Sequence, residues 1–308
     1  MKLRILFVNI NGLRSKGRYA RFVEICSRLV RKKEAIVFAV QEHNLDPDKH
    51  IEYERLATMR NFTLKISYDK ASPNGVNHGG TLILSDNSHI TEESPPNQPQ
   101  LDPGITEARM DWGGEKIRLL NVYTPVDPDL RKNFLSEVLP KHLTSTTVAV
   151  GDWNCVPDVT TDVQSRNPLG YSNIGGQQLE DEMSKVSLSD FRRDQLGSEY
   201  EPTRVQGGTA TRLDRAYIPL EKDDILWNLE VRPDIVWSDT PSDHLPIVLQ
   251  YETPTGDRGC ERELVDENLL LSYEVRDKIR RITKTAYEEG RRNERKAKKM
   301  VESNEIHL

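Results

Sequence analysis

Cysteines, long apolar runs and a net positive charge are all missing or scarce in this 308-residue chain. The three cysteines, Cys26, Cys155 and Cys260, lack the close spacing of metal ligands, which is typical of free thiols in a reducing compartment. No run approaches the roughly 18 apolar residues of a membrane span, and the N-terminal MKLRILFVNI lacks the pattern of a cleavable signal. We therefore expect an intracellular protein with no membrane partner.

The charges are unevenly distributed along the chain. The formal net charge of −6 argues against a protein held to nucleic acid by bulk electrostatics alone. Between residues 276 and 299, however, 11 Lys and Arg residues stand against 4 Asp and Glu residues. Such a segment is ordinarily a solvated helix, but it can also hold phosphates, and its last part, RRNERKAKK, is a candidate nuclear localisation patch. On that basis we expect the protein in the nucleus.

Hydrophobic patterning predicts many strands and few helices up to residue 252. Strands are expected at 3–10, 35–40, 62–68, 80–85, 105–112, 116–123, 147–150, 213–218, 229–237 and 246–251, and helices at 18–31, 128–142 and 176–186. Segment 203–211 is typical of a hairpin that turns at Gly207-Gly208. The pattern favours a layered α/β sandwich over residues 1–252, followed by a polar linker and a basic helical tail over 253–308.

Polar side chains recur where the predicted strands begin or end. They are Asn9 and Asn11 in NING, Glu42 in QE, Asn121 and Tyr123 in NVY, Asp152 and Asn154 in GDWN, Asp214 in RLDR, and Asp243 and His244 in SDH. Taken singly, each is ordinary, since Asn-Gly usually makes a turn and a lone Glu is usually solvated. A charge beside a buried strand is nevertheless costly unless it is paired or holds a metal. Together, these residues form a chemically coherent set.

Two kinds of chemistry fit this set. Mg²⁺ prefers a few oxygen ligands, which Glu42, Asp243 and Asn11 supply, and Mn²⁺ is the alternative ion. Hydrolysis of a phosphate ester needs a positioned water, a base and stabilisation of negative charge. No serine or cysteine stands in a convincing setting for a nucleophile, so we expect water to attack.

The remaining polar residues supply those functions. Asp152 can orient or deprotonate the water, and Asn154 and Tyr123 can donate hydrogen bonds to phosphate oxygens. His244 can act on the phosphate or as a base while a carboxylate holds it in one tautomer.

Six motifs in this order, NING, QE, NVY, GDWN, RLDR and SDHLP, resemble the endonuclease/exonuclease/phosphatase superfamily. That superfamily includes DNase I, abasic-site nucleases of the exonuclease III type, inositol polyphosphate 5-phosphatases and sphingomyelinases. The resemblance covers about residues 1–252. Within the superfamily, NINGL, QEHN, GDWNCVPD and SDHLPI are similar to phrases in the endonuclease domain of LINE-type non-LTR retrotransposons.

The resemblance implies a four-layered α/β sandwich of two β-sheets and cleavage of DNA phosphodiesters with Mg²⁺. It also implies a role for each matching position. Glu42 is the principal metal ligand; Asn11 takes the place of an aspartate of the abasic-site enzymes; Asn9 supports the metal and the Asp243-His244 network; Tyr123 contacts the scissile phosphate; Asp152 activates water; Asn154 stabilises the phosphoryl group; Asp214 orients His244 or helps the metal; and Asp243 binds the metal or the histidine. Asn9, Asn121 and Arg212 are candidate substrate contacts, with a structural ion pair as the alternative for Arg212.

The resulting prediction is a Mg²⁺-dependent endonuclease that nicks double-stranded DNA to leave a 3′-hydroxyl for reverse transcription. Its expected partners are DNA and the reverse transcriptase region of the same polyprotein. One alternative is an abasic-site repair nuclease, which Asn11 and the long tail disfavour. Another is an inositol-phosphate phosphatase, which would need further basic residues near the site, and a third is a non-catalytic binding module. Trp153 is expected in the core beneath the site, and His43 and His78 receive no role.

Overall fold

The protein is described from a computed structural model that covers residues 2–69, 79–88, 91–92, 102–112, 115–165, 173–197, 199–220, 227–237 and 242–252. The expected tail over 253–308, with its basic segment and Cys260, lies outside the described residues, and so does His78. The tail and its boundary therefore stay predictions. The helices of the described part all fall short of the length and apolar character that a membrane span requires.

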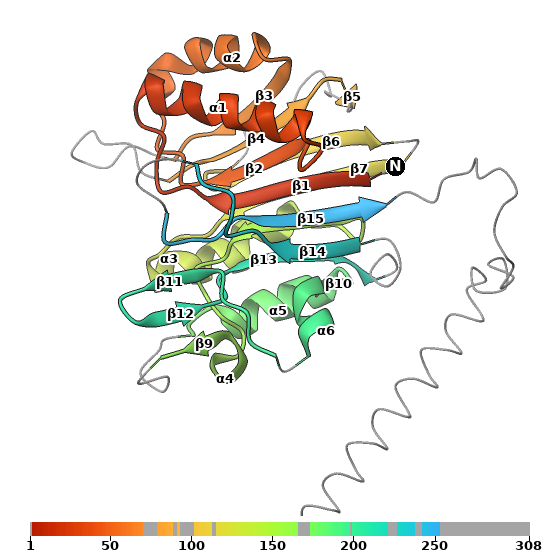
Figure 1. Ribbon diagram of the computed structural model, residues 1–308. Helices are drawn as coiled ribbons and strands as arrows, with labels where there is room; N and C mark the ends of the chain where they lie inside the picture. The colour runs from red at the N-terminus through yellow and green to blue at the C-terminus, as the bar shows by residue number, and fades with distance from the viewer. Residues whose placement is uncertain are drawn as a thin grey trace, which may run out of the picture. The chain divides into compact units, whose positions relative to one another are not determined.

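The first of two large sheets has six strands (Figure 1). In spatial order they are β14 (Trp227–Val231), β15 (Ile247–Glu252), β1 (Lys2–Asn9), β2 (Val37–Gln41), β4 (Thr81–Asp86) and β3 (Phe62–Ser67). Only β1 and β2 run parallel among these paired strands, and α1 (Lys16–Arg31) makes the crossover between them. Ser15 caps this helix, because its hydroxyl accepts a hydrogen bond from the backbone N–H of Arg18 at 3.1 Å.

The second large sheet also has six strands and again contains one parallel pair, β7 with β8. Its order is β10 (Leu188–Asp190), β13 (Asp214–Pro219), β8 (Thr147–Asp152), β7 (Glu115–Tyr123), β6 (Ile105–Trp112) and β5 (Thr91–Glu92). The parallel pair is connected by α3 (Pro128–Asn133), a π-helical turn (η2, Phe134–Val138) and a 3-10 turn (η3, Leu139–Lys141). A small third sheet contains β11 (Arg204–Gln206), β12 (Thr209–Thr211) and β9 (Val163–Gln164).

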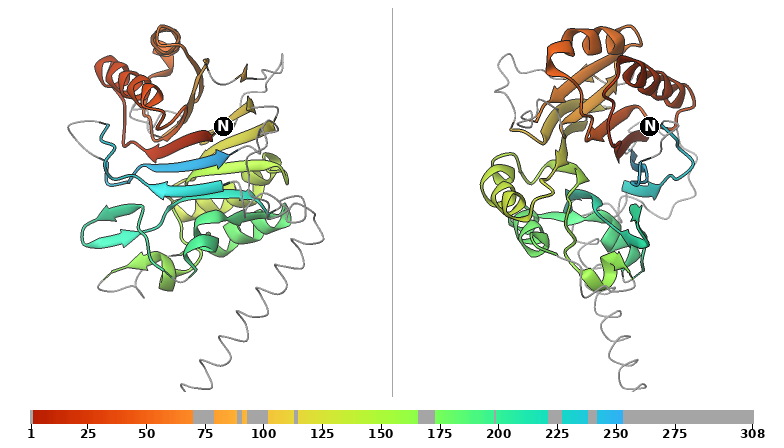
Figure 2. Two further views of the ribbon diagram at one scale, coloured as in Figure 1. Left: turned by 45° about the vertical axis from the view of Figure 1, so that its right-hand side comes forward. Right: turned by 90° about the vertical axis from the view of Figure 1, so that its left-hand side faces the viewer.

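The two large sheets pack face to face, and helices cover their outer faces (Figures 1 and 2). Phe7 of the first sheet and Val150 of the second belong to one fully buried cluster between the sheets. Helix α1 and α2 (His50–Thr58) pack on the first sheet, and α5 (Gly176–Lys185) with η2 packs on the second. Full burial of such a side chain stabilises the fold by roughly 1.5–3 kcal/mol. The predicted four-layered α/β sandwich is confirmed.

Most predicted elements agree with the structure to within a few residues, and the differences have local causes. The strand expected at 229–237 ends at Val231, because Pro233 has no N–H and restricts the residue before it. The helix expected at 128–142 breaks into α3, η2 and η3. The prediction missed η1 (Pro47–Lys49), α2, α4 (Val159–Asp162), β5, β9, β10 and α6 (Phe191–Leu196), all but α2 of which have at most six residues.

Trp153 lies in the core, as expected. Its side chain is fully buried and meets Tyr217 edge-on at 5.3 Å between ring centroids. The indole N–H donates to the carbonyl of Arg215 at 3.4 Å. Cys26 and Cys155 are free and buried, in agreement with the expected free thiols.

A buried network of ion pairs joins α4, β10 and the start of β13. Arg212 binds Asp162 and Asp190 at 2.9 and 2.7 Å, and Arg215 binds the same two carboxylates at 2.7 and 2.5 Å. All four side chains are at most 5% exposed. Because all four charged side chains are removed from water, the arginines and the carboxylates must neutralise each other for the network to be stable.

Replacing Arg215 by Ala should therefore lower the free energy of unfolding by about 3–5 kcal/mol, because it leaves two carboxylates buried with too little positive charge. Urea denaturation at neutral pH measures this change. Arg232→Ala is the matched control, since Arg232 binds Glu34 and Asp234 but Asp234 is 62% exposed. The control should cost less than about 1 kcal/mol. Equal losses in the two variants would contradict the structural role of the buried network.

Candidate active site at the common edge of the two sheets

The polar strand ends of both large sheets meet at one edge. Asn9 ends β1 of the first sheet, and Asp152 ends β8 of the second. The side-chain amide of Asn9 donates to Asp152 Oδ2 at 2.9 Å, so the two sheets are linked at this point. Tyr123 and Asp214 are the register partners of Asp152 on the neighbouring strands β7 and β13. The strand register therefore places Tyr123, Asp152 and Asp214, three of the expected site residues, side by side.

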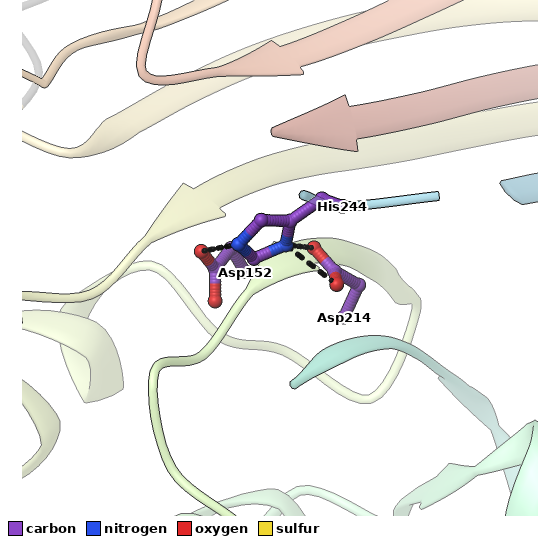
Figure 3. A group of neighbouring side chains, drawn as sticks. All are labelled: Asp152, Asp214 and His244. Carbon is purple, nitrogen blue, oxygen red and sulfur yellow. Dashed lines mark hydrogen bonds and ion pairs between the residues drawn. The ribbon is translucent and has the colours of Figure 1, made fainter. Parts of the chain in front are cut away.

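His244 lies between two buried carboxylates (Figure 3). Its Nδ1 is 2.9 Å from Asp214 Oδ2 and 3.1 Å from Asp214 Oδ1, and its Nε2 is 3.7 Å from Asp152 Oδ2. The Asp152 carboxylate also accepts hydrogen bonds from Asn9 and from the backbone N–H of Asn154. All three members of the group are at most 6% exposed. The expected orientation of His244 by Asp214 is thus present in the structure.

The electrostatics of this group favour an imidazolium ion. Burial alone would lower the pKa of His244, but the charges of Asp214 and Asp152 outweigh burial and raise the pKa to about 9. Burial raises the pKa of Asp152, an effect that the charge of His244 opposes and the charge of Asp214 reinforces. At neutral pH a protonated His244 can donate from both ring nitrogens, and Asp152 is a carboxylate poised to exchange a proton.

Thr203 supports this group, although the sequence analysis assigned it no role. Its hydroxyl donates to Asp214 Oδ2 at 2.6 Å and accepts the backbone N–H groups of Leu213 and Asp214 at 3.1 and 3.0 Å. Because the two N–H groups occupy the oxygen lone pairs, the hydroxyl proton must point at Asp214. The Thr203 carbonyl also accepts the N–H of Leu245, next to His244. No sequence motif signals this contact, which depends on the register of the hairpin.

Glu42 follows β2 in a left-handed backbone conformation, with φ of 56°, and its side chain is half-buried. Tyr123 Oη donates to Glu42 Oε1 at 3.0 Å, and burial raises the pKa of Tyr123, so this phenol keeps its proton. His43 locks the turn: its Nδ1 accepts the N–H of Leu45 at 2.9 Å and its Nε2 lies 3.0 Å from the carbonyl of Ser67. Burial lowers the pKa of His43 to about 4, so His43 is a neutral structural residue.

The segment that carries Asn11 runs beside Glu42, because the Ile10 N–H donates to the Gln41 carbonyl at 3.1 Å and the Leu13 N–H donates to the His43 carbonyl at 2.7 Å. Asn11 is exposed, and its backbone N–H donates to Asn9 Oδ1 at 3.1 Å. Asp69 is a further carboxylate that the sequence analysis missed: burial raises its pKa, and the charge of Glu42 adds to the rise. Among the described residues, Asp69 Oδ1 is buried without a hydrogen-bond partner. An orphaned carboxylate oxygen beside a second carboxylate fits a divalent cation.

The structure contradicts two of the expected substrate contacts. Asn121 is fully buried, where its amide donates to the carbonyls of Val40 and Leu82 at 3.0 and 2.9 Å and accepts from Gln41 Nε2. Its role is to join the sheets. Arg212 is 1% exposed and is occupied by Asp162 and Asp190, so the structural ion pair is the correct alternative.

Asn154 and Asp243 both contact protein groups in the structure, and their expected roles toward a phosphate and a metal stay predictions. The Asn154 amide donates to the carbonyl of Thr124 at 2.8 Å, and Asn154 is half-buried. Asp243 does not hydrogen-bond His244, whose Nδ1 is taken by Asp214; its carboxylate instead binds Arg204 at 2.7 Å.

One group of metal-ligating side chains emerges in the part of the chain that the structure describes, namely Asp152, Asp214 and His244, whose ligand atoms lie within 4.8 Å of one another. A protonated histidine between the two carboxylates already supplies the positive charge that this group needs. The oxygen donors around Glu42 suit Mg²⁺ better, because they are hard ligands without a competing cation.

Comparisons with known proteins agree with this architecture. The family model described as Endonuclease/Exonuclease/phosphatase family matches residues 6–244. A search of curated proteins found no match to the chain. Solved structures with a similar fold include the AP endonuclease LMAP from Leishmania major, at a TM-score of 0.65 and 13% identity, over 82% of this chain and 88% of that one.

An AP endonuclease from Archaeoglobus fulgidus matches at a TM-score of 0.58 and 18% identity, over 82% of this chain and all of that one. The endonuclease domain of TRAS1, a telomere-specific non-LTR retrotransposon, matches at 0.50 and 17% identity, over 82% of this chain and 98% of that one. At these identities the likeness shows the fold alone.

Replacing Asp214 by Asn should lower the pKa of His244 from about 9 by roughly 1–3, because it removes the charge that raises this pKa most. NMR titration of the imidazole signals measures the change. Asp243→Asn is the control, since Asp243 contributes less to the shift than Asp214 does.

The same shift fixes the sign of a stability change in the metal-free protein. A raised pKa means that protonated His244 stabilises the fold fully below its ordinary pKa of 6.5, and that this stabilisation is lost as pH rises through about 9. The free energy of unfolding should therefore fall between pH 6.5 and 9, and it should fall less in His244→Gln. A histidine that titrates near 6.5 in the wild type would refute the assignment.

Proposed function

The chain belongs to the endonuclease/exonuclease/phosphatase family, whose members are hydrolases of phosphate esters, and on this premise we propose that it is a Mg²⁺-dependent DNA endonuclease. The observation that carries the proposal is the edge of the sandwich where a buried Asp152–His244–Asp214 group lies with the hydrogen-bonded pair of Glu42 and Tyr123. The first group moves protons, and the second offers oxygen ligands and a phenol donor.

In this proposal Asp152 orients the attacking water and takes its proton. Asn9 and the N–H of Asn154 hold the carboxylate in place, and its raised pKa brings it closer to neutral pH. Attack forms a new P–O bond and breaks the bond to the 3′ oxygen, which takes up a proton from a solvent water and leaves as a hydroxyl, while the phosphate stays on the 5′ side of the nick. His244, kept protonated, stabilises the negative charge on the phosphoryl oxygens.

Asp214 and Thr203 act on His244 and not on the substrate. Asp214 fixes the ring by its contact with Nδ1, and Thr203 fixes the Asp214 carboxylate. The Nε2–H is thereby directed to the side of Asp152. Tyr123, whose phenol keeps its proton, is placed to donate to a phosphate oxygen when the substrate displaces it from Glu42.

Glu42 would hold the Mg²⁺, together with Asp69, whose pKa the charge of Glu42 raises, and Asn11 on the adjacent segment. When bound, the ion supplies Lewis-acid stabilisation of charge on the phosphoryl group and the leaving oxygen. Mn²⁺ accepts the same oxygen ligands and is the alternative.

The finer assignment is to a LINE-type retrotransposon endonuclease. The phrases NINGL, GDWNCVPD and SDHLPI and the asparagine at position 11 support it. The protein would then nick one strand of double-stranded DNA in the nucleus and leave a 3′-hydroxyl that primes the reverse transcriptase region of the same polyprotein. The alternative within the family is an abasic-site nuclease, since two of the solved structures with a similar fold are AP endonucleases. An abasic duplex cut faster than an intact one would favour this alternative.

Replacing Glu42 by Gln should lower the rate of Mg²⁺-dependent nicking of supercoiled plasmid by more than about 100-fold, because the neutral amide holds the ion too weakly. Conversion of supercoiled to open-circular DNA measures the rate, and EDTA should stop it in the wild type.

Direct Mn²⁺ binding, followed by calorimetry, should weaken in the same variant while its unfolding curve stays that of the wild type. Glu52→Gln is the control, because Glu52 is an exposed glutamate whose partner is Lys16. Nicking at the wild-type rate by Glu42→Gln would contradict the metal assignment. A wild type that leaves both plasmid and abasic DNA intact would contradict the proposed endonuclease activity.

A further inference from the structure

Arg204 lies on β11 of the hairpin, directly opposite His244. The two residues form an isolated antiparallel bridge. On either side, Val205 N–H donates to the carbonyl of Asp243 at 2.9 Å and Leu245 N–H donates to the carbonyl of Thr203 at 2.7 Å. The first strand of the hairpin is therefore fixed to the segment that carries the catalytic histidine.

The guanidinium of Arg204 is aimed by two side chains. Its Nε donates to Asp243 Oδ2 at 2.7 Å, and its Nη2 donates to Gln206 Oε1. Its Nη1 has no hydrogen-bond partner among the described residues, and 29% of the Arg204 side chain is exposed. One edge of the planar fork is thus held, while the rest remains available to a ligand.

Asp243 has no other charged partner at hydrogen-bond distance in the described part of the chain. Asp243 was expected to bind the metal or the histidine, and Nδ1 of that histidine is bound by Asp214. A carboxylate already neutralised by a guanidinium at 2.7 Å is a poor ligand for a divalent cation, because the two cations would repel each other. The contact that Asp243 does make is the one that sets the direction of Arg204.

The hairpin has no other charge. Residues 203–211, TRVQGGTAT, contain Arg204 as their single ionisable side chain. A planar guanidinium with free donors is the side chain best suited to bind phosphate, in one plane and with two hydrogen bonds. In a chain of net charge −6, a cation held beside the catalytic histidine is therefore a specific feature and not part of a basic surface.

We propose that Arg204 binds a backbone phosphate of the DNA next to the scissile bond, and that Asp243 is a positioning residue for Arg204 and not a metal ligand. This inference rests on the proposed endonuclease function and deepens it. Arg204 binds the substrate from the hairpin, and the pairing of the hairpin with 243–245 keeps that contact in register with His244.

Binding of a fluorescent duplex in EDTA, where no cleavage occurs, tests the first half of the inference. Arg204→Ala should weaken binding about 10-fold, as expected for the loss of a hydrogen bond to a charged group, and should make the negative slope of log affinity against log salt shallower by about 0.9. Arg204→Lys should keep the slope and lose part of the affinity, because it retains charge without the fork. Arg232→Ala, whose arginine binds Glu34 and Asp234, is the control and should change neither quantity.

Asp243→Asn tests the second half. It should reproduce part of the binding loss of Arg204→Ala, and the double variant should bind no more weakly than Arg204→Ala, because both changes remove one contact. Mn²⁺ affinity in calorimetry should stay within about 2-fold of the wild type in Asp243→Asn and fall at least about 10-fold in Glu42→Gln.

Two results overturn the inference alone: a wild type that nicks DNA while Arg204→Ala keeps its affinity and salt slope, or an Asp243→Asn variant that loses Mn²⁺ as Glu42→Gln does. A folded wild type that neither binds nor cuts DNA contradicts the endonuclease and this inference together.

Discussion

Two carboxylates, Asp152 and Asp214, are buried beside each other at the edge where both sheets end, and most of the site follows from that constraint. Neither can stay ionised away from water unless a positive charge or hydrogen-bond donors compensate it. His244 supplies the charge between them, and Asn9 and Thr203 supply donors. The same arrangement that makes burial tolerable keeps an imidazolium beside a carboxylate of raised pKa, which is the requirement for moving a proton during hydrolysis.

Both large sheets bring their polar strand ends to the site in the same way. Each large sheet contains a parallel pair joined by a crossover, β1 with β2 and β7 with β8, and the carboxyl ends of parallel strands lie at the same edge. Asn121 ties the two sheets within the core and Asn9 ties them at the site. The polar strand ends therefore divide into two groups, since some join the sheets and others line the candidate site. The buried Arg212–Arg215 network holds β13, and with it Asp214, from the opposite side.

The sequence was sufficient to predict the sandwich and the strand ends, because periodicity reports which strands are buried and where they stop. The Asp214–His244 contact followed from the family resemblance, which gave metal binding as the alternative role of Asp214. It could not tell which polar residues point inward, so Asn121 and Arg212 were expected at the substrate and lie in the core. Thr203, Asp69 and Arg204 escaped notice for another reason. Their contacts depend on how segments distant in sequence align, for example Arg204 opposite His244, and no local pattern encodes that register.

If water attacks the phosphorus and the 3′ oxygen departs, as we propose, every nick must carry a 3′-hydroxyl. The direct measurement is to isolate plasmid nicked by the protein in Mg²⁺ and to offer it, without further treatment, to a DNA polymerase and labelled nucleotides. We expect immediate incorporation of nucleotides that starts at the nick. Incorporation that appears only after a phosphatase has removed a 3′-phosphate would contradict it.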